Sequence, residues 1–272
     1  MARYFGFSVP ASGVWSTIDF PTNAEYTERK EYYEDFVLGG SRDKRVFGVT
    51  EISNEINVSY DLNGLKFIEN VLGTINASSI STITADVPVN DYYTLTEEGT
   101  LCIKGAKVNT WELVIETGEP VTAEFNAIGT LTDVSASQAF TPNFSVVPLK
   151  HCDCSLSVDS TINSLWTRIN LEIDNAIEPI YKTCTVPVDL REAGLEVTGA
   201  LRAPEFYQLV AEGSMEVRLG TVGTIVMPNV QFQEESNRVE GFDLPETEIS
   251  FTAYPTASTN AVWVKLGNTI RW

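Results

Sequence analysis

Apolar residues along the 272-residue chain alternate with polar ones in short runs that are separated by turn residues. In residues 121–128, Val121, Ala123, Phe125 and Ala127 fall on one face, which is the period of a half-buried antiparallel strand. Similar β-branched or alternating runs cover residues 58–62, 108–115, 169–173, 215–219 and 249–254. Turn residues lie between these runs, at Gly118, Pro120, Gly220, Gly223, Pro228, Asn229, Gly241 and Pro255. The pattern predicts an all-β fold.

Two stretches have helical spacing instead. Residues 65–72 place Phe67 and Val71 on one side and end before a glycine. Residues 204–212 begin with a proline, place Phe206 on an apolar side, and also end before a glycine. Proline at the start and glycine after the end are typical of helix boundaries. We therefore expect one or two short helices within the β-structure.

The order of these elements recurs, which predicts a tandem duplication. A strand at 58–62 precedes the first helix, and a strand at 196–201 precedes the second. Two further strands follow in each half, at 99–103 and 120–127, and then at 223–227 and 245–253. The matching pairs are Phe67 with Phe206 and Phe125 with Phe251. Chance similarity among ordinary strands is the alternative.

The repeat suggests four segments along the chain. Residues 46–146 and 147–256 are expected to form two similar β-domains, between an N-terminal arm at 1–45 and a C-terminal arm at 257–272. Both arms are aromatic, whereas chain ends are usually polar. We expect them to make inter-subunit contacts, or alternatively to cap the core of their own domain. The residues concerned are Trp15, Phe20, Tyr32, Tyr33, Trp263 and Trp272.

The charge balance excludes nucleic-acid binding as the main role. The chain has 18 basic and 37 acidic residues and a formal net charge of −19. Binding to phosphates by counterion release requires clustered Lys and Arg, which this chain lacks. Its apolar runs are shorter than the roughly 18–20 residues of a membrane helix, and its start does not resemble a secretory signal. We expect synthesis in a cytoplasm and no membrane partner.

The cysteines and the single histidine raise the question of a metal site. Residues 151–154 read His-Cys-Asp-Cys, and Cys102 and Cys184 lie elsewhere. On a strand, Cys152 and Cys154 would share one face and His151 the other. Structural zinc sites usually space their cysteines by two to four residues in a turn. We therefore expect reduced, packed thiols in place of zinc, and no cofactor.

An acidic run offers an enzymatic alternative. Glu172, Asp174 and Glu178 resemble the carboxylate signature of a jelly-roll glycosidase family. A retaining glycosidase needs two carboxyl groups about 5–5.5 Å apart, and in that family the second carboxylate follows the Asp by two residues, or by three with a bulge. Here the interval is four, and Ala176 occupies the unbulged position. We expect a solvated strand face and no enzyme.

A segment in the first half resembles the tail tube proteins of long-tailed viruses. It reads Gly-Ala-Lys-Val-Asn-Thr-Trp from residue 105, followed by Gly-Glu-Pro-Val-Thr from residue 118. Ala106 stands where the family frequently has Cys. Segments 39–45 and 225–230, the latter with a Pro-Asn-Val turn, also fit the family, so the resemblance covers about residues 25–256. The matching motif residues are Gly105, Lys107, Val108, Asn109, Trp111, Gly118, Pro120, Val121 and Thr122.

The resemblance implies a structural protein of the virion tail, of a siphovirus- or myovirus-like virus of bacteria or archaea. It implies a β-sandwich or half-barrel that completes a β-barrel on oligomerisation, in stacked rings around a channel for genome passage. With the duplication, the ring would be a trimer with pseudo-six-fold symmetry. Implied partners are copies of the chain and the tape measure, tail terminator and baseplate proteins, while the genome passes without specific binding. The main alternative is another virion β-sandwich protein, in a decoration, baseplate or tail-tip role.

Overall fold

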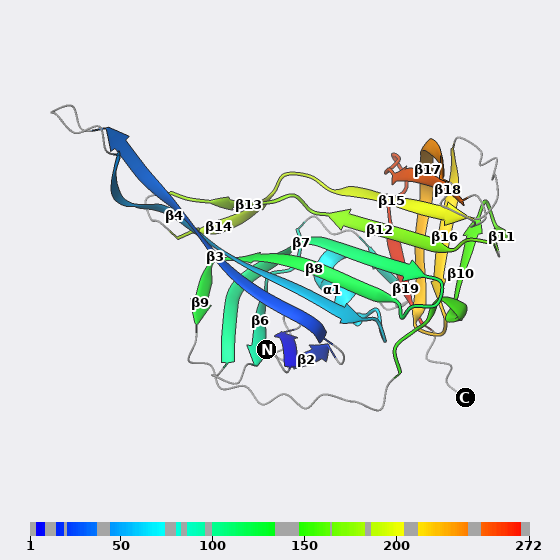
Figure 1. The fold of residues 1–272 in the computed structure, drawn as a ribbon, viewed down its shortest axis with the longest axis horizontal. Helices are drawn as coiled ribbons and strands as arrows, with labels where there is room; N and C mark the ends of the chain where they lie inside the picture. Colours follow the sequence, from blue (N-terminus) through cyan, green and yellow to red (C-terminus); the bar gives the residue numbers. More distant parts are fainter. Residues whose placement is uncertain are drawn as a thin grey trace.

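The computed structural model describes most of the chain. The described residues are 4–8, 15–18, 21–36, 44–73, 80–82, 86–95, 100–133, 147–163, 165–182, 186–203, 212–238 and 246–267. They form an all-β structure with short helical turns, as the alternating pattern predicts (Figure 1).

The first half of the chain supplies one set of seven strands joined by six antiparallel pairings. The pairings are β1–β2, β1–β6, β3–β4, β4–β8, β6–β7 and β7–β8. The strands are β1 (Tyr4–Ser8), β2 (Trp15–Ile18), β3 (Pro21–Phe36), β4 (Lys44–Asp61), β6 (Asn90–Leu95), β7 (Thr100–Glu116) and β8 (Thr122–Gly129).

The second half supplies seven strands with the same six pairings in the same order. These are β10–β11, β10–β16, β12–β15, β15–β18, β16–β17 and β17–β18. The strands are β10 (Cys154–Val158), β11 (Thr161–Asn163), β12 (Arg168–Asp174), β15 (Glu196–Ala203), β16 (Glu212–Leu219), β17 (Gly223–Arg238) and β18 (Glu246–Ala253). Pairing of β7 with β12 joins the two sets into one continuous sheet.

The remaining elements are short. A 3₁₀ turn, η1 (Lys66–Ile68), leads into α1 (Glu69–Leu72), which ends at Gly73 and confirms the first predicted helix. The others are β5 (Ile80–Thr82), β9 (Leu131–Asp133), η2 (His151–Asp153), β13 (Ile177–Ile180), β14 (Asp189–Glu192) and β19 (Trp263–Leu266). Strands β13 and β14 pair only with each other and form a small lobe beside the main sheet (Figure 1).

Two predictions in the second half need comment. Residues 204–211 of the second expected helix, with Phe206, lie outside the described residues, but Gly213 does not end a helix, because it lies inside β16. The expected turn at Pro228 and Asn229 is also wrong, since both residues lie inside β17. Proline has no N–H for a ladder. It is accommodated at a bulge opposite Ser214, whose N–H bonds the carboxylate of Asp159 instead.

The expected N-terminal arm contains regular strands. Residues 21–36 form β3, which pairs with β4 over its whole length, and the two strands project together from the body of the molecule (Figure 1). Residues 28–31 are exposed. The alternation that marks a half-buried strand is missing at residues 28–31 because side chains on both faces of the strand are exposed there.

The core lies against one face of the continuous sheet. Fully buried side chains from both halves include Phe125, Trp111 and Phe251. The Phe125 ring lies 4.3 Å from that of Phe67 and 5.5 Å from that of Phe5, measured between ring centroids. The Trp111 indole N–H donates to the Tyr60 hydroxyl at 3.1 Å. This aromatic cluster holds β1, the helical turn and β8 together.

Replacing Phe125 with alanine should lower the free energy of unfolding by about 3–5 kcal/mol, because it empties a rigid aromatic site that cannot collapse. Urea denaturation would measure the change. Val89→Ala, at a side chain that is 54% exposed, should change stability by less than about 0.5 kcal/mol. Equal effects of the two substitutions would contradict the placement of the core.

Candidate functional site: the polar sheet face and the motif that supports it

The face of the continuous sheet opposite the core carries a row of polar side chains that crosses both halves. Residues directly opposite one another on paired strands point to the same face. Successive pairings therefore align one residue from each of seven strands. The row consists of Ser59, Glu124, Glu112, Glu172, Thr198, Thr252 and Gln231, on β4, β8, β7, β12, β15, β18 and β17. A single polar surface thus spans the junction of the two halves.

Carboxylates are concentrated where β7 and β12 meet. Glu112 lies directly opposite Glu172, and Glu196 lies opposite Asp174. Partial burial raises the pKa of Glu172, and the neighbouring charges of Glu112, Asp174 and Glu196 raise it further. The junction therefore holds repelling negative charges on its polar side, while apolar side chains pack on its other side.

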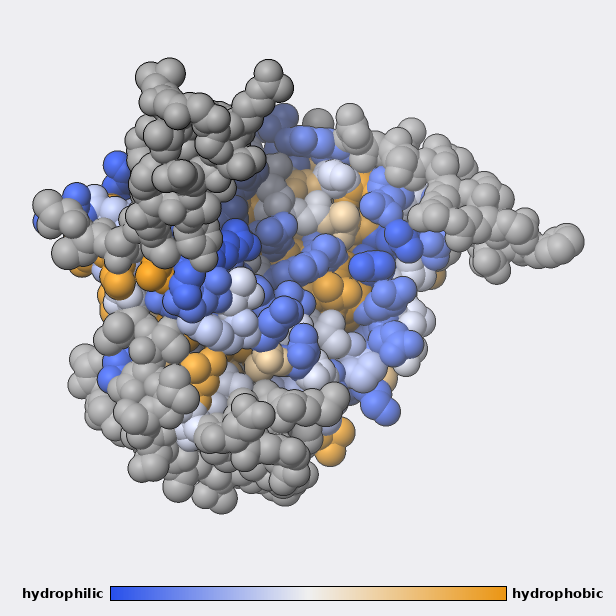
Figure 2. Space-filling model, turned by 60° about the vertical axis from the view of Figure 1, so that its left-hand side comes forward, coloured by the Kyte–Doolittle hydropathy of each residue, from blue (hydrophilic) through white to orange (hydrophobic). Residues whose placement is uncertain are grey.

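Ion pairs balance the charge farther along the same strands. Arg168 lies 3.5 Å from Glu116 across the β12–β7 junction, and Arg202 lies 2.7 Å from Glu248 across β15 and β18. In the view of Figure 2, hydrophilic residues predominate across the middle of the molecule, with small apolar groups among them. Arginine thus compensates part of the negative charge on the polar sheet face.

The motif that begins at Gly105 anchors the small lobe to the sheet. Gly105 has φ +60°, and its N–H donates to the Asp91 carboxylate at 2.9 Å. Lys107 is almost buried, and its ammonium group lies 2.9 Å from the carboxylate of Glu192 at the end of β14. Glycine is favoured at position 105 because other residues rarely adopt a positive φ.

Asn109 and Asn175 complete this anchor. The N–H of Asn175 donates to the Asn109 carbonyl, and the N–H of Ile177 donates to the Asn109 side-chain oxygen, both at 2.7 Å. The buried amide group of Asn175 donates to the carbonyls of Val71 and Val108, at 3.1 and 3.0 Å. Asn175 therefore connects α1, β7 and the lobe.

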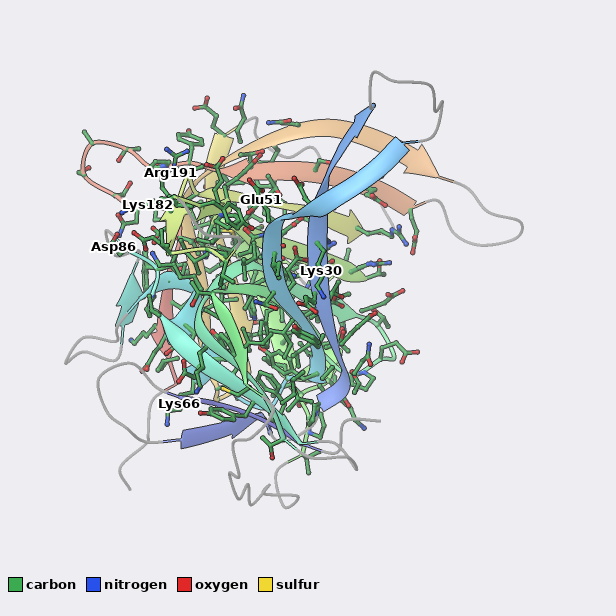
Figure 3. All side chains as sticks on the ribbon, turned by 90° about the vertical axis from the view of Figure 1, so that its left-hand side faces the viewer. Lys30, Glu51, Lys66, Asp86, Lys182 and Arg191 are labelled. Atoms are coloured by element: carbon green, nitrogen blue, oxygen red, sulfur yellow. The ribbon has the colours of Figure 1, made fainter. Side chains whose placement is uncertain are left out.

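The lobe in turn supports the projecting hairpin. Tyr181, which follows β13, has a side-chain hydrogen bond with Ser53 on β4. Burial raises the pKa of the Tyr181 hydroxyl, and the carboxylates of Glu51 and Glu31 raise it further. Figure 3 shows Arg191 and Lys182 of the lobe region beside the hairpin that carries Glu51 and Lys30. The motif thus sets the position of the hairpin through the lobe.

The rest of the motif closes the β7–β8 turn. Gly118 has φ +89°, and Pro120 forms an isolated bridge with Lys150. The N–H of Val121 donates to the Leu149 carbonyl at 2.8 Å, and the Val121 carbonyl accepts from Leu62 at 2.7 Å. The last motif residue, Thr122, begins β8. The motif residues thus have structural roles in holding strands and turns together.

The described aromatic residues expected at the arms belong to three different strands. Trp15 belongs to β2, and Tyr32 and Tyr33 belong to β3. Phe20 and Trp272 lie outside the described residues. Trp263 is half-buried on β19, which pairs with β17 and β5. Its neighbours Val262 and Val264 are fully buried, so this part of the C-terminal segment covers the core of its own chain.

The three carboxylates of the glycosidase alternative are divided between two strands. Glu172 and Asp174 lie on β12, but Glu178 lies on β13 in the separate lobe and forms an ion pair with Arg191. The three carboxylates therefore do not lie on one strand face. The asparagine between them, Asn175, is the functional residue that the sequence argument missed.

The cysteine cluster is folded differently from the expected strand. Residues 151–153 form η2, because the N–H of Lys150 bonds the Asp153 carboxylate at the start of that turn. Cys102 is buried, Cys152 is exposed, and burial raises the pKa of the Cys154 thiol to about 12. Cys184 lies outside the described residues. Over the described part of the chain, no group of three or more potential metal ligands converges.

Comparisons with known proteins agree with the motif. A family model described as phage tail tube protein matches residues 8–204. No curated protein matches the chain. No helix within the described ranges is long and apolar enough to cross a membrane.

Replacing Asn175 with alanine should cost about 1–3 kcal/mol of stability, because two buried carbonyls lose their donor. Thermal or urea unfolding would show the loss. Asn229→Ala removes one exposed hydrogen bond, to Thr259, and should be nearly neutral. Similar costs for the two variants would argue against the anchoring role of Asn175.

Glu172→Gln should raise stability at pH 7 by about 0.2–1 kcal/mol, because it removes like charges on opposite strands. A carboxyl group with a raised pKa in the fold destabilises the fold when ionised. The advantage of the variant should therefore disappear below the unfolded-state pKa of about 4.3 and grow as the pH rises through the folded-state value. Unfolding curves from pH 3.5 to 8 would test this, and a pH-independent difference would contradict it.

Proposed function

The chain belongs to the phage tail tube protein family, and we propose that copies of it form stacked rings around a channel through which the viral genome passes. Family membership makes it a structural component of the virion tail. The ring, the channel and the stacking are the parts that we propose here. The family match favours this role over a decoration, tip or glycosidase role.

The observation that carries the proposal is the repeated strand pairing together with the β7–β12 junction. Each half of the chain has the same six pairings, and β12 of the second half pairs with residues 110–116 of β7, so that the two halves form one sheet. Phe125 on β8 and Phe251 on β18 are both buried at matching places. A chain that already joins two similar units side by side supports lateral extension by further copies. Three chains would supply six similar units, which gives a trimer with pseudo-six-fold symmetry.

The two repeat units that we propose begin at other residues than the two β-domains expected from the sequence. Strands β1 to β3 have the same pairings as β10 to β12, so the first unit would run from β1 to β8 and not from residue 46. The second unit would run from β10 to β18. The C-terminal segment from residue 257 would remain outside the repeat, with Trp263 at its β19 strand.

We propose that the polar sheet face lines the channel. Its carboxylates Glu112, Glu124 and Glu172 would repel DNA phosphates at short range. A basic wall would instead retain the genome through counterion release. The net charge of −19 supports passage without specific binding.

The wider context follows from the family. The virus would be siphovirus- or myovirus-like, with a bacterial or archaeal host in whose cytoplasm the chain is made. Partners in the tail would be further copies of the chain and the tape measure, terminator and baseplate proteins. The aromatic residues Trp15, Phe20, Tyr32, Tyr33 and Trp272 remain candidates for contacts between subunits and rings.

Negative-stain electron microscopy of the concentrated protein, with tail initiator added if needed, should show stacked rings or hollow tubes. Class averages viewed down the axis should have three-fold symmetry with six similar lobes. Compact monomers at every concentration and salt tested would argue for a decoration or tip role. Strict six-fold rings of six chains would refute the trimer.

A further inference from the structure

We propose that the cavity on β10, β16, β17 and β19 binds an acidic sugar, that is, a ring with several hydroxyl groups and one carboxylate. The cavity has a volume of about 460 Å³, which is within the range of small-molecule sites. Its four strands lie at the end of the molecule away from the projecting hairpin (Figure 1). The site does not depend on the proposed ring, because all of its residues come from one chain.

Strand register places four polar residues side by side in this cavity. Ser155 on β10 lies opposite Arg218 on β16. Thr224 on β17 lies opposite Arg218 on one side and Lys265 of β19 on the other. Residues directly opposite one another share a face. The next residue of β17, Ile225, is fully buried, so the polar row points away from the core.

A second row lies two residues farther along β10 and β16. Ser157 lies opposite Glu216, and both residues line the cavity. Thr221, in the turn between β16 and β17, adds a further hydroxyl group. Glu216, Arg218 and Lys265 are exposed. The cavity thus combines several hydroxyl groups with one carboxylate and two cations.

The two cations are unusual in a chain with 18 basic and 37 acidic residues. Arg168, Arg191 and Arg202 each form an ion pair with a glutamate. Among the residues that the structure describes, neither Arg218 nor Lys265 forms an ion pair with a carboxylate. Two cations that meet at one cavity without such partners favour binding of an external anion.

Close backbone packing forms one wall of the cavity. The N–H of Gly267, which follows β19, donates to the Val222 carbonyl at 2.5 Å. A Cβ at position 267 would lie 1.8 Å from the carbonyl oxygen of Thr221. A Cβ on Gly223 would lie 2.5 Å from the carbonyl oxygen of Lys265. The β16–β17 turn and the end of β19 therefore contact each other directly, which gives the cavity a preformed wall, as is usual for small-molecule sites.

The combination of groups fits an acidic sugar better than a simple anion or a neutral sugar. The planar guanidinium of Arg218 matches a carboxylate, and Lys265 adds a compact positive charge. Serine and threonine hydroxyls both donate and accept hydrogen bonds. Glu216 accepts hydrogen bonds from sugar hydroxyls but repels a bare anion. A neutral sugar would leave both cations without a counter-charge.

Ligand-observed NMR titration of the full chain with D-glucuronate, D-galacturonate and N-acetylneuraminate tests the proposal. At least one of the three should bind saturably in the millimolar range, as expected for a small polar ligand. D-Glucose should bind at least about tenfold more weakly, because it lacks the charge that pairs with the cations. Inorganic phosphate, added as a competitor, should also be at least about tenfold weaker, because it lacks the sugar hydroxyls.

Substitutions locate the site. Arg218→Gln and Lys265→Gln should each weaken binding of the acidic sugar by about tenfold, since each removes a charged donor. Glu216→Gln should strengthen competition by phosphate, because it removes a repelling charge. Arg191→Gln is the matched control: it removes an equal charge from an exposed residue of the small lobe and should leave the affinity unchanged. Melting temperatures would show that the variants remain folded.

Four results would overturn the proposal. The first is that none of the three acids binds saturably. The second is binding that is insensitive to Arg218→Gln and Lys265→Gln, which would place the sugar elsewhere. The third is that glucose or phosphate binds as tightly as the acidic sugars. The fourth is that a glutamate-rich peptide binds more tightly than every sugar, which would assign the cavity to a protein partner.

Discussion

Residues 110–116 of β7 and 168–174 of β12 pair across the boundary between two otherwise separate sheets. Without this ladder, Trp111 and Ile173 would lie at open edges, and the aromatic core behind them would be exposed to water. With it, the apolar face of one half continues into that of the other, and the polar row continues on the opposite face. The cost is that Glu172 is partly buried opposite Glu112: the burial raises the pKa of Glu172, and the charge of Glu112 raises it further. Burial of the large apolar side chains outweighs that repulsion, because like charges on an exposed strand face cost only about 0.2–1 kcal/mol, whereas one buried aromatic side chain contributes about 1.5–3 kcal/mol.

The motif residues explain how a short sequence signature determines distant structure. Gly105 bonds Asp91 from a positive-φ position within β7, and Lys107 forms an ion pair with Glu192. Asn109 accepts the hydrogen bond of the Ile177 N–H, where the chain enters the lobe. The lobe then contacts the hairpin through Tyr181. A chain of contacts therefore runs from the centre of the sheet to its longest projection. This makes the motif a positioning device, which suits a protein whose work is assembly.

Strand identity could be predicted where one face is buried. The alternation of Val121, Ala123, Phe125 and Ala127 predicts the buried face of β8, and Gly118 and Gly220 mark turns that have positive φ. Prediction failed for β3, because its residues 28–31 are exposed on both faces and therefore show no alternation. It also failed for Pro228, because the bulge that tolerates proline depends on Asp159, which is distant in sequence. Asn175 could not be recognised as an anchor, since its acceptors are main-chain carbonyls of Val71 and Val108, which no side-chain pattern reveals.

Covalent linkage of two units within one chain has a consequence for the thermodynamics of assembly. In a ring of the proposed kind, every second contact between units is already formed when the chain folds. Two associations then bring three chains together, whereas five would be needed for six separate units. Each association avoided spares an estimated 4–15 kcal/mol of lost translational and rotational freedom. The pairing of β7 with β12 also persists at any dilution, because the two strands belong to one chain and have a high effective concentration. Only the contacts between chains can therefore form and dissociate with concentration. The control of when a tail begins to grow thus depends on these contacts.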